Sequence, residues 1–473
     1  MTIENIRNYT FAFLLTSALP SFAGPIDEAK ALYNDGQYEQ AADELNRIVK
    51  KTPRDGTANY YLGASLYELG RFDEAIPALK VAAGRNVVDA SRLLALCSLQ
   101  NYEADEAASY MDAWEAALKK SKKAIPDSFE SLSTRILNMR NMLERVEKIE
   151  ILDSISVDSA SFFNKYRISE AAGRILPPDA VRRIGAGNPS AELSLAYAPQ
   201  SNTEIIWAET DTAGIYNLYG ASILDDGTIE SAKTLGDNLG EGGDAKFPFL
   251  MPDGVTLYFA NNGENSIGGY DIFMTRRTDD GSFFQPQNLG MPYNSTANDY
   301  MLAIDEVSGL GWWATDRNSE PGMVTIYIFS PSNVRVNVEP GDENLTALAL
   351  LSDISLTRKP DVNYQDLLLS RIPEEPEMTD PEKQQRFSID MGKGKVYTRL
   401  SDFKNSAAKS AMLEVLACEA ELRNSHKLVE NLRSTYRSGD HSVGSSIKEL
   451  ETTIERLHKQ HKALRNKVIR LEK

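Results

Sequence analysis

The chain has 473 residues, more than one typical domain holds, so two to four folding units are expected. Its net charge of −17 disfavours nucleic acid or anionic membranes as main partners, since phosphates repel an acidic protein. The one basic run identified, Lys119–Lys123, is typical of a solvated helix end. Two cysteines, Cys97 and Cys418, exclude a disulfide framework and form no CxxC pair. Each lies in an apolar helical stripe, which predicts buried thiols.

Residues 1–23 have the pattern of a cleaved signal peptide. Arg7 precedes an apolar run over 9–19, and the small residues Ser21 and Ala23 stand three and one before a cut site. The run is shorter than the roughly 20 residues that a membrane-spanning helix needs. We therefore expect cleavage near Ala23, no transmembrane span in the mature chain, and a periplasmic or outer-membrane-associated protein. The alternative is that the run is a buried first helix.

Residues 24–148 contain a helical repeat with a period of 34. Residues 36–41 (GQYEQA) recur as 70–75 (GRFDEA). The glycine suits a left-handed cap after the first helix of each unit, the aromatic residue docks into the groove between helices, and the alanine lets paired helices approach closely. A third, weaker copy spans 93–107, and a helix over 132–146 is expected to cap the stack.

These features resemble tetratricopeptide repeats over about residues 25–146. The resemblance implies a concave groove that holds peptides or partner proteins. With two or three repeats the groove is short, and the alternative is that the stack only docks onto the neighbouring domain.

After Glu150 the sequence changes to short alternating runs separated by Gly, Asn and Asp, which indicates β-structure. The best-formed unit, 247–273, has a Pro-Asp-Gly turn, an apolar strand and then Gly-Tyr-Asp-Ile-Phe. The same order appears over 198–219 and 303–327, at a spacing of about 53 residues. Three copies of one supersecondary pattern predict a radial array of sheets.

This pattern resembles the WD40-like, TolB-type propeller repeat. The resemblance is clearest over 193–330 and weaker over 149–178 and 345–400. It implies an all-β domain over 149–400, a β-propeller of five or six blades. It also implies that the polar residues of 298–300 and 315–318 tie turns and loops together.

A signal peptide, tetratricopeptide-like repeats and this propeller type together look like envelope proteins of Bacteroides-type Gram-negative bacteria. Many such relatives add an OmpA-type, peptidoglycan-binding domain at the C-terminus. This chain has a predicted coiled coil there instead, so direct anchoring to peptidoglycan is not expected.

An acidic, proline-bearing stretch, 371–384, predicts a surface linker within the propeller region. It is followed by a predicted hairpin with strands at 386–391 and 396–400. This hairpin either closes the propeller or begins the C-terminal stalk.

Two heptad seams of apolar residues, 411–436 and 447–471, predict a coiled coil over 401–473. A stripe this narrow needs a partner helix. The helices either fold back as a hairpin within the chain, which we favour, or pair between chains through 411–471. His461 lies in the second seam, either as a polar residue that sets the register or as a group whose protonation weakens the pairing.

The sequence provides no catalytic, cofactor-binding or metal-binding residues. All four histidines, His426, His441, His458 and His461, lie in the tail, which excludes a Ser-His-Asp or Cys-His site and a His-ligated metal from the propeller region. Walker A, GxSxG and HExxH motifs are missing from the sequence. We therefore expect a protein that is not an enzyme and carries no cofactor.

The predicted function is an exported protein–protein interaction scaffold of the bacterial cell envelope that supports an outer-membrane or secretion assembly. Envelope or secretion proteins are the expected partners, and nucleic acid is not. One alternative is a carbohydrate-binding propeller, in which Trp207, Trp312, Trp313 and Tyr270 form a sugar-stacking platform instead of packing in the blades. The other is a two-carboxylate, glycan-active enzyme.

Overall fold

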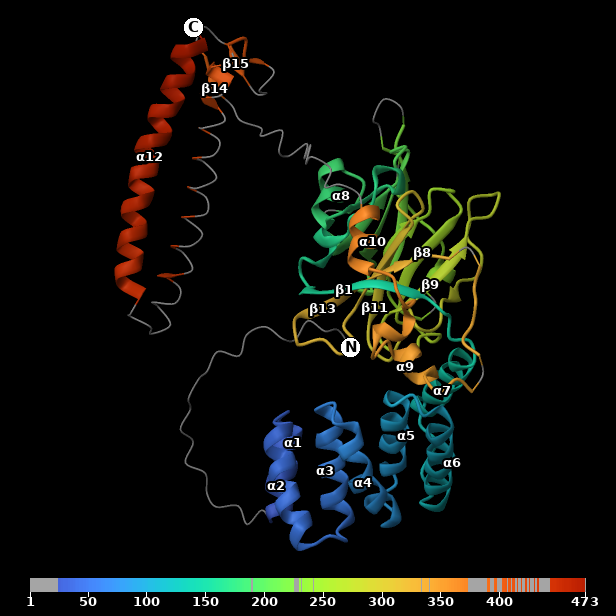
Figure 1. The fold of residues 1–473 in the computed structure, drawn as a ribbon. Coiled ribbons are helices and arrows are strands. Elements are labelled where there is room, and N and C mark those ends of the chain that lie inside the picture. Colours follow the sequence, from blue (N-terminus) through green and yellow to red (C-terminus); the bar gives the residue numbers. More distant parts are fainter. Residues whose placement is uncertain are drawn as a thin grey trace. The chain divides into compact units, whose positions relative to one another are not determined.

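The computed structural model contains two compact units, Met1–Pro373 and Glu374–Lys473, which are described separately (Figure 1). The described residues are 24–372 without 189, 225–228, 231, 241, 333 and 340, then 389–391, 395–397, 402–405, 407–409, 411–412, 415, 418, 422, 425, 429, 432–433 and 443–472. The predicted signal peptide and most of the predicted linker lie outside them. Within these parts, no helix combines the length and hydrophobicity needed to cross a membrane.

The first unit begins with a stack of seven helices in which each helix packs against the next (Figure 1). They are α1 (Pro25–Asn34), α2 (Tyr38–Lys51), α3 (Gly56–Glu68), α4 (Phe72–Gly84), α5 (Ala90–Gln100), α6 (Ala104–Lys120) and α7 (Ser128–Leu143). The short connections produce helix pairs of the predicted repeat type.

The repeat residues adopt the expected local geometry. Gly36 and Gly70 follow the first helix of their pairs with φ of 76° and 71°, a conformation that costs glycine little. Ala75 is fully buried where α4 crosses α3. A Cβ on Gly63 would lie 2.4 Å from Cγ of Leu79, so this glycine permits the close approach of α3 and α4.

The stack has two hydrophobic cores, and only the second includes residues from the β-rich part. The first joins α1 to α4 with part of α5 and contains Ala41, Leu45, Leu62, Ala75, Leu79 and Cys97. The second joins α5 to α7 with the β-rich part and contains Trp114, Ile136, Met139, Ile267, Met291 and Val338. The end of the stack is therefore fixed to the β-rich part by a shared core.

The β-rich part contains three antiparallel sheets in its described residues. The first consists of β2 (Arg174–Leu176), β3 (Leu193–Ala198), β4 (Glu204–Thr210), β5 (Tyr216–Ser222) and β6 (Lys233–Thr234), and the second of β7 (Ala245–Leu250), β8 (Thr256–Asn261), β9 (Asp271–Arg276) and β10 (Gln287–Asn288). The third consists of β11 (Asp299–Asp305), β12 (Leu310–Thr315), β13 (Met323–Ser330) and β1 (Glu150–Asp158).

The internal repeat of the sequence is also a repeat of hydrogen bonds. In the second sheet, Asn262 Oδ1 accepts from the Asp244 amide at 2.7 Å. In the third, 54 residues later, Asp316 Oδ1 accepts from the Asn298 amide at 2.8 Å. Each bond ties the start of a sheet to the end of its second strand, so the two units share the same local design.

Successive sheets pack through their first strands, β7 against β3–β5 and β11 against β7–β9. Strand β1 comes from before the repeats and pairs with β13 at the edge of the third sheet, from Glu150 opposite Ser330 to Asp158 opposite Met323. The predicted unit at 149–178 is therefore not a separate blade but supplies β1 and β2 to two other sheets. The described residues of the β-rich part hold three sheets where five or six blades were predicted.

The prediction of blade strands over 345–400 is wrong for the described residues up to 372. They form short helices instead: α9 (Leu345–Leu350), the 3₁₀ helix η5 (Ile354–Thr357) and α10 (Tyr364–Arg371). One more short helix, α8 (Pro178–Ile184), follows β2 earlier in the chain. Asn363 caps α10, since its Oδ1 accepts from the amides of Gln365 and Asp366. Side-chain capping and apolar residues at helical spacing outweigh the weak repeat resemblance here.

The second unit contains a short hairpin, β14 (Ile389–Asp390) and β15 (Val396–Tyr397), and the long helix α12 (Gly444–Glu472). The described residues between 407 and 433 are also helical. Ala411 and Val415 share a core with Val468, and Cys418 and Val429 share one with Leu457 and Ile454, so the two helical segments run antiparallel within the chain. Buried hairpin residues such as Ile389 and Tyr397 belong to this core and not to the sheets.

Candidate functional site

One side of α1 and α3 carries a row of half-buried tyrosines. The ring of Tyr33 on α1 lies 5.5 Å from the rings of Tyr38 and Tyr61, and the Tyr60 ring lies 5.3 Å from that of Tyr61. Tyr67 lies two turns further along α3. The name tyrosine face is used below for Lys30, Tyr33, Tyr60, Tyr61, Tyr67 and Arg92.

The helix period explains why these tyrosines stay accessible. Helix α3 buries Leu62 and Leu66 in the first core, whereas Tyr60, Tyr61 and Tyr67 remain only partly covered. Their rings pack on the edge of that core, so they are held in place without being enclosed. Amphipathic rings with ordered positions are well suited to contact another protein.

Charged groups extend the tyrosine face. The Lys30 ammonium lies 5.5 Å above the Tyr61 ring. Asp89 accepts a hydrogen bond from the Tyr60 hydroxyl at 3.0 Å and two from Arg92 at 2.9 and 2.8 Å. Burial raises the pKa of Tyr60, and Asp89 raises it further. Burial alone would raise the pKa of Asp89, but its bonds to Arg92 and Tyr60 hold that pKa below the ordinary value.

The tyrosine face ends where the stack meets the β-rich part. The guanidinium of Arg135 on α7 donates two hydrogen bonds to the Ile267 carbonyl, at 2.8 and 3.2 Å. Tyr102, in the α5–α6 connection, accepts from the Thr296 amide at 3.2 Å. Docking onto the neighbouring domain thus occurs at the third repeat and α7, while the core of the first two pairs includes no β-rich residue.

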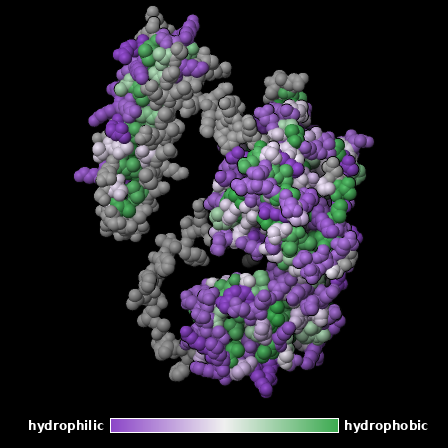
Figure 2. All heavy atoms as spheres, viewed as in Figure 1, coloured by the Kyte–Doolittle hydropathy of each residue, from purple (hydrophilic) through white to green (hydrophobic). Residues whose placement is uncertain are grey.

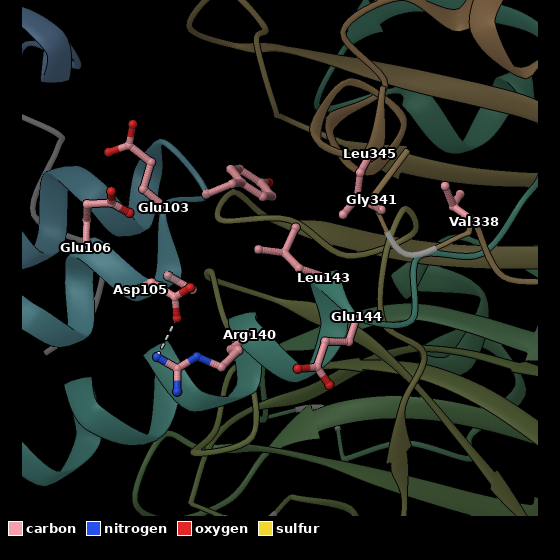
Figure 3. A pocket seen from close by; sticks show the side chains of 11 residues that line it. Glu103, Asp105, Glu106, Arg140, Leu143, Glu144, Val338, Gly341 and Leu345 are labelled. Carbon is pink, nitrogen blue, oxygen red and sulfur yellow. Dashed lines mark ion pairs between the residues drawn. The ribbon is translucent and has the colours of Figure 1, made fainter. Parts of the chain in front are cut away.

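A cleft of about 890 Å³ lies at this junction, between α6, α7 and the segment 338–345 (Figure 3). Its apolar lining includes Leu143 and Leu345. Its rim is acidic, with Glu103, Asp105, Glu106 and Glu144, and the one cation, Arg140, is paired with Asp105 at 2.7 Å. Asp105 and Glu106 lie on α6, Glu103 directly precedes that helix, and Glu144 directly follows α7.

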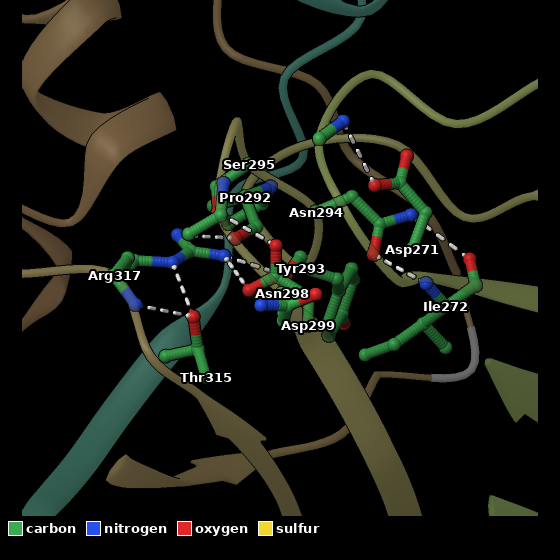
Figure 4. Close-up of polar contacts among 12 residues, drawn as sticks. Asp271, Ile272, Pro292, Tyr293, Asn294, Ser295, Asn298, Asp299, Thr315 and Arg317 are labelled. Carbon is green, nitrogen blue, oxygen red and sulfur yellow. Dashed lines mark hydrogen bonds and ion pairs between the residues drawn. The ribbon is translucent and has the colours of Figure 1, made fainter. Parts of the chain in front are cut away.

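Three of the polar residues predicted to tie loops together, Asp299, Thr315 and Arg317, are buried at the third sheet (Figure 4). Arg317 donates to Asp299 Oδ1 at 2.6 Å, to the carbonyls of Pro292 and Tyr293 at 3.0 and 2.6 Å, and to Thr315 Oγ1 at 3.2 Å. The cluster therefore stabilises loop structure and confirms that part of the prediction for 298–300 and 315–318.

A second carboxyl, Asp271, is completely buried at the start of β9. Its oxygens accept from the Asn288 side chain at 2.7 Å and from the Ile267 amide at 3.0 Å. Burial raises the pKa of Asp271 to about 7, against the effect of these hydrogen bonds. The Ile267 carbonyl also accepts hydrogen bonds from Arg135. Asp271 therefore fixes the loop on which the helical stack docks.

The three tryptophans of the alternative sugar-stacking platform lie in the core, in agreement with the other prediction, that they pack between strands, whereas Tyr270 is only partly buried. Trp207, Trp312 and Trp313 have no exposed surface, so they are not accessible to a sugar. Trp312 and Trp313 are consecutive on β12 and point to opposite faces of the third sheet, into two separate cores, while Trp207 lies in a third. Both predicted buried thiols, Cys97 and Cys418, are buried and unpaired in disulfides.

The described histidines lie in the C-terminal helical unit, as expected from the sequence. His458 and His461 lie on α12, and His426 and His441 lie outside the described residues. No group of three or more potential metal-ligating side chains occurs among the described residues. The sequence analysis identified no site residues, although the 34-residue period of the repeat also relates Tyr33 to Tyr67, two members of the tyrosine face.

Comparison with known proteins bears on the helical stack. Residues 26–87 match the tetratricopeptide repeat family. This range contains α1 to α4 and most of the tyrosine face. The chain is also similar to a solved structure of the Yersinia enterocolitica type III secretion translocator chaperone SycD, with 25% identity, coverage of 25% of this chain and 79% of that chain, and a TM-score of 0.21. No curated protein matches.

Proposed function

We propose that this protein is a non-enzymatic protein–protein interaction scaffold whose tyrosine face holds an extended segment of a partner protein. The observation that carries the proposal is the row of four ordered, half-exposed tyrosines across α1 and α3, within the range that matches tetratricopeptide repeats. Tyrosine supplies large contact area and a hydroxyl at low cost in conformational entropy, which is why it is frequent at binding hot spots.

The other two parts of the chain would present this binding site. We propose that the three sheets are the blades of a propeller-type domain, supported by their 54-residue repeat and by their packing through β7 and β11. The C-terminal helices would form a coiled-coil hairpin, supported by their shared apolar seam, with self-association as a further possibility for assembly.

The proposed location is the periplasm or the outer-membrane surface of a bacterial envelope, with envelope or secretion proteins as partners. This part of the proposal depends on the signal-peptide pattern of residues 1–23 and on the resemblance to envelope proteins of Bacteroides-type bacteria. Purified protein should hydrolyse no member of a glycan panel, and hydrolysis of any of them would overturn the non-enzyme assignment.

Site-specific photocrosslinking in intact cells tests the binding site. A benzoylphenylalanine at Tyr61 should form a discrete crosslink to a partner protein, to be identified by mass spectrometry. The same group at Asn46, which is exposed on α2 away from the tyrosine face, is the matched control. Equal products from both positions, or recovery of nothing but the protein itself, would contradict the proposal.

The identified partner then permits a quantitative test. Replacing Tyr33 and Tyr61 together by alanine should weaken binding of the purified partner at least tenfold, since hot-spot tyrosines contribute more than about 1 kcal/mol each. Circular dichroism must show that helix content is unchanged. Undiminished affinity in a folded double variant would place the partner elsewhere on the chain.

A further inference from the structure

The second half of α12 is strongly basic although the chain as a whole is acidic. Residues 456–471 contain no aspartate or glutamate. They include six cations, namely Arg456, Lys459, Lys462, Arg465, Lys467 and Arg470. With −17 for the whole chain and +6 in this stretch, the remainder carries −23, so the net charge conceals a local charge of opposite sign.

Four of these cations lie on the outer side of the helix. Arg456, Lys459, Lys462 and Arg470 are exposed, whereas Leu457 and Val468, on the opposite side, are fully buried. At 3.6 residues per turn the four side chains centre on the face opposite the seam and span about 21 Å along the axis. The name basic stripe is used for these four residues. Figure 2 shows hydrophilic side chains projecting along one edge of α12 beside a hydrophobic band.

The packing of α12 leaves the basic stripe on its exposed side. Apolar side chains of the preceding helical segment, among them Ala411, Val415 and Val429, share cores with Val468 and Leu457 on the other side of α12. The one acidic residue at the end of α12, Glu472, instead accepts hydrogen bonds from the amides of Lys404 and Asn405. The hairpin fold thus gathers cations on one side and directs its last carboxylate elsewhere.

We propose that the basic stripe binds the phosphate headgroups of an anionic lipid surface. A straight helix with cations along one side matches a flat, negatively charged plane, and each such cation near an anionic membrane strengthens binding by about fivefold. The predicted signal peptide favours lipid over nucleic acid, because it would direct the chain to an envelope compartment that is bounded by membranes. The stripe would hold the C-terminal unit at a membrane.

Vesicle sedimentation with the full mature chain tests this proposal. The protein should pellet with vesicles of 30% phosphatidylglycerol in phosphatidylcholine but not with vesicles of phosphatidylcholine alone. Replacing Lys459 and Lys462 by glutamine should reduce the partition coefficient about 25-fold, from two factors of about five. The matched control is glutamine at Lys122 and Lys123, an exposed basic pair in the helical stack, which should leave the coefficient unchanged.

Each other outcome would overturn the assignment. Equal binding to both kinds of vesicle would indicate that the charge is irrelevant, and an equal loss in both variants would indicate a general effect of charge. Tighter binding to a short DNA duplex than to the anionic vesicles would assign the stripe to nucleic acid. Helix content measured by circular dichroism, together with the retained monomer or oligomer size, separates loss of the stripe from loss of folding in the Lys459/Lys462 variant.

Discussion

Breaking the buried ion pair between Arg317 and Asp299 is expected to destabilise the β-rich part by about 3–5 kcal/mol. Both side chains are almost completely buried, with exposed fractions of 4% and 0%. Replacing Arg317 by glutamine leaves the Asp299 carboxylate without its cation and the carbonyls of Pro292 and Tyr293 without a donor. An uncompensated buried charge is costly because the interior solvates it poorly.

Urea unfolding followed by tryptophan fluorescence measures this loss. Three of the four tryptophans, Trp207, Trp312 and Trp313, are buried in the β-rich part, so the signal reports mainly on that part. With an m-value of about 2 kcal/mol/M, the midpoint should fall by about 1.5–2.5 M. Adding the Asp299→Asn substitution should recover part of the loss, since the pair is then removed without leaving a charge.

A second ion pair of the same chemistry provides the control. Arg277 contacts Glu204 through two hydrogen bonds, at 3.2 and 2.8 Å, but both side chains are about a quarter exposed. Arg277→Gln should therefore cost no more than about 1 kcal/mol and shift the midpoint by less than about 0.5 M. If the two substitutions shift the midpoint equally, burial does not decide the strength of these pairs and the reasoning is wrong.

Three further predictions concern other described residues. Gly70→Ala forces alanine into a left-handed conformation and should cost about 1–2 kcal/mol of stability, so hydrogen exchange of α3 and α4 should accelerate about 5- to 30-fold. The control is Gly84→Ala, which adds a methyl group in open space at a helical φ and should slow the exchange. The pKa of about 7 at Asp271 means that the folded state binds this proton more tightly than the unfolded state, so the free energy of unfolding should fall by a few kcal/mol as pH rises from about 4 to 7. Asp271→Asn should abolish this contribution to the pH dependence of stability, and an unchanged pH dependence would refute the assignment. Burial raises the pKa of Cys97 to about 12, so Cys97 should not react with Ellman's reagent until the chain is unfolded. Cys418 is also buried, so the reagent should not reach it in the folded chain either.

Features that depend on local sequence were predicted well. The 34-residue repeat specified helix pairs because glycine caps, small residues and aromatic residues act within one pair, as Gly36, Gly70 and Ala75 show. The spacing of 54 residues also identified the second and third sheets, since a turn and the strands beside it form one local unit. Where a short motif determines its own structure, sequence reasoning needs no knowledge of distant contacts.

Features that depend on long-range contacts were missed. Strand β1 pairs with β13, about 170 residues later in the chain, and no local motif specifies that choice of edge. The tyrosine face joins α1, α3 and α5, so its residues look like ordinary helix positions until the stack is assembled. The basic half of α12 was also missed, because the heptad pattern depends only on the apolar positions and the net charge combines these six cations with the acidic remainder of the chain.

The docking of the third repeat changes what so short a stack can do. A repeat unit cannot bury its faces alone, and a stack of two or three pairs is close to the minimum for stability. Here the shared core of α5 to α7 with Ile267 and Met291 provides the missing neighbour at one end. A partner that binds the tyrosine face therefore meets helices already held in place and does not need to order them, which lowers the entropic cost of binding. On this reasoning, loosening the docking at Arg135 should weaken partner binding even though Arg135 lies outside the tyrosine face.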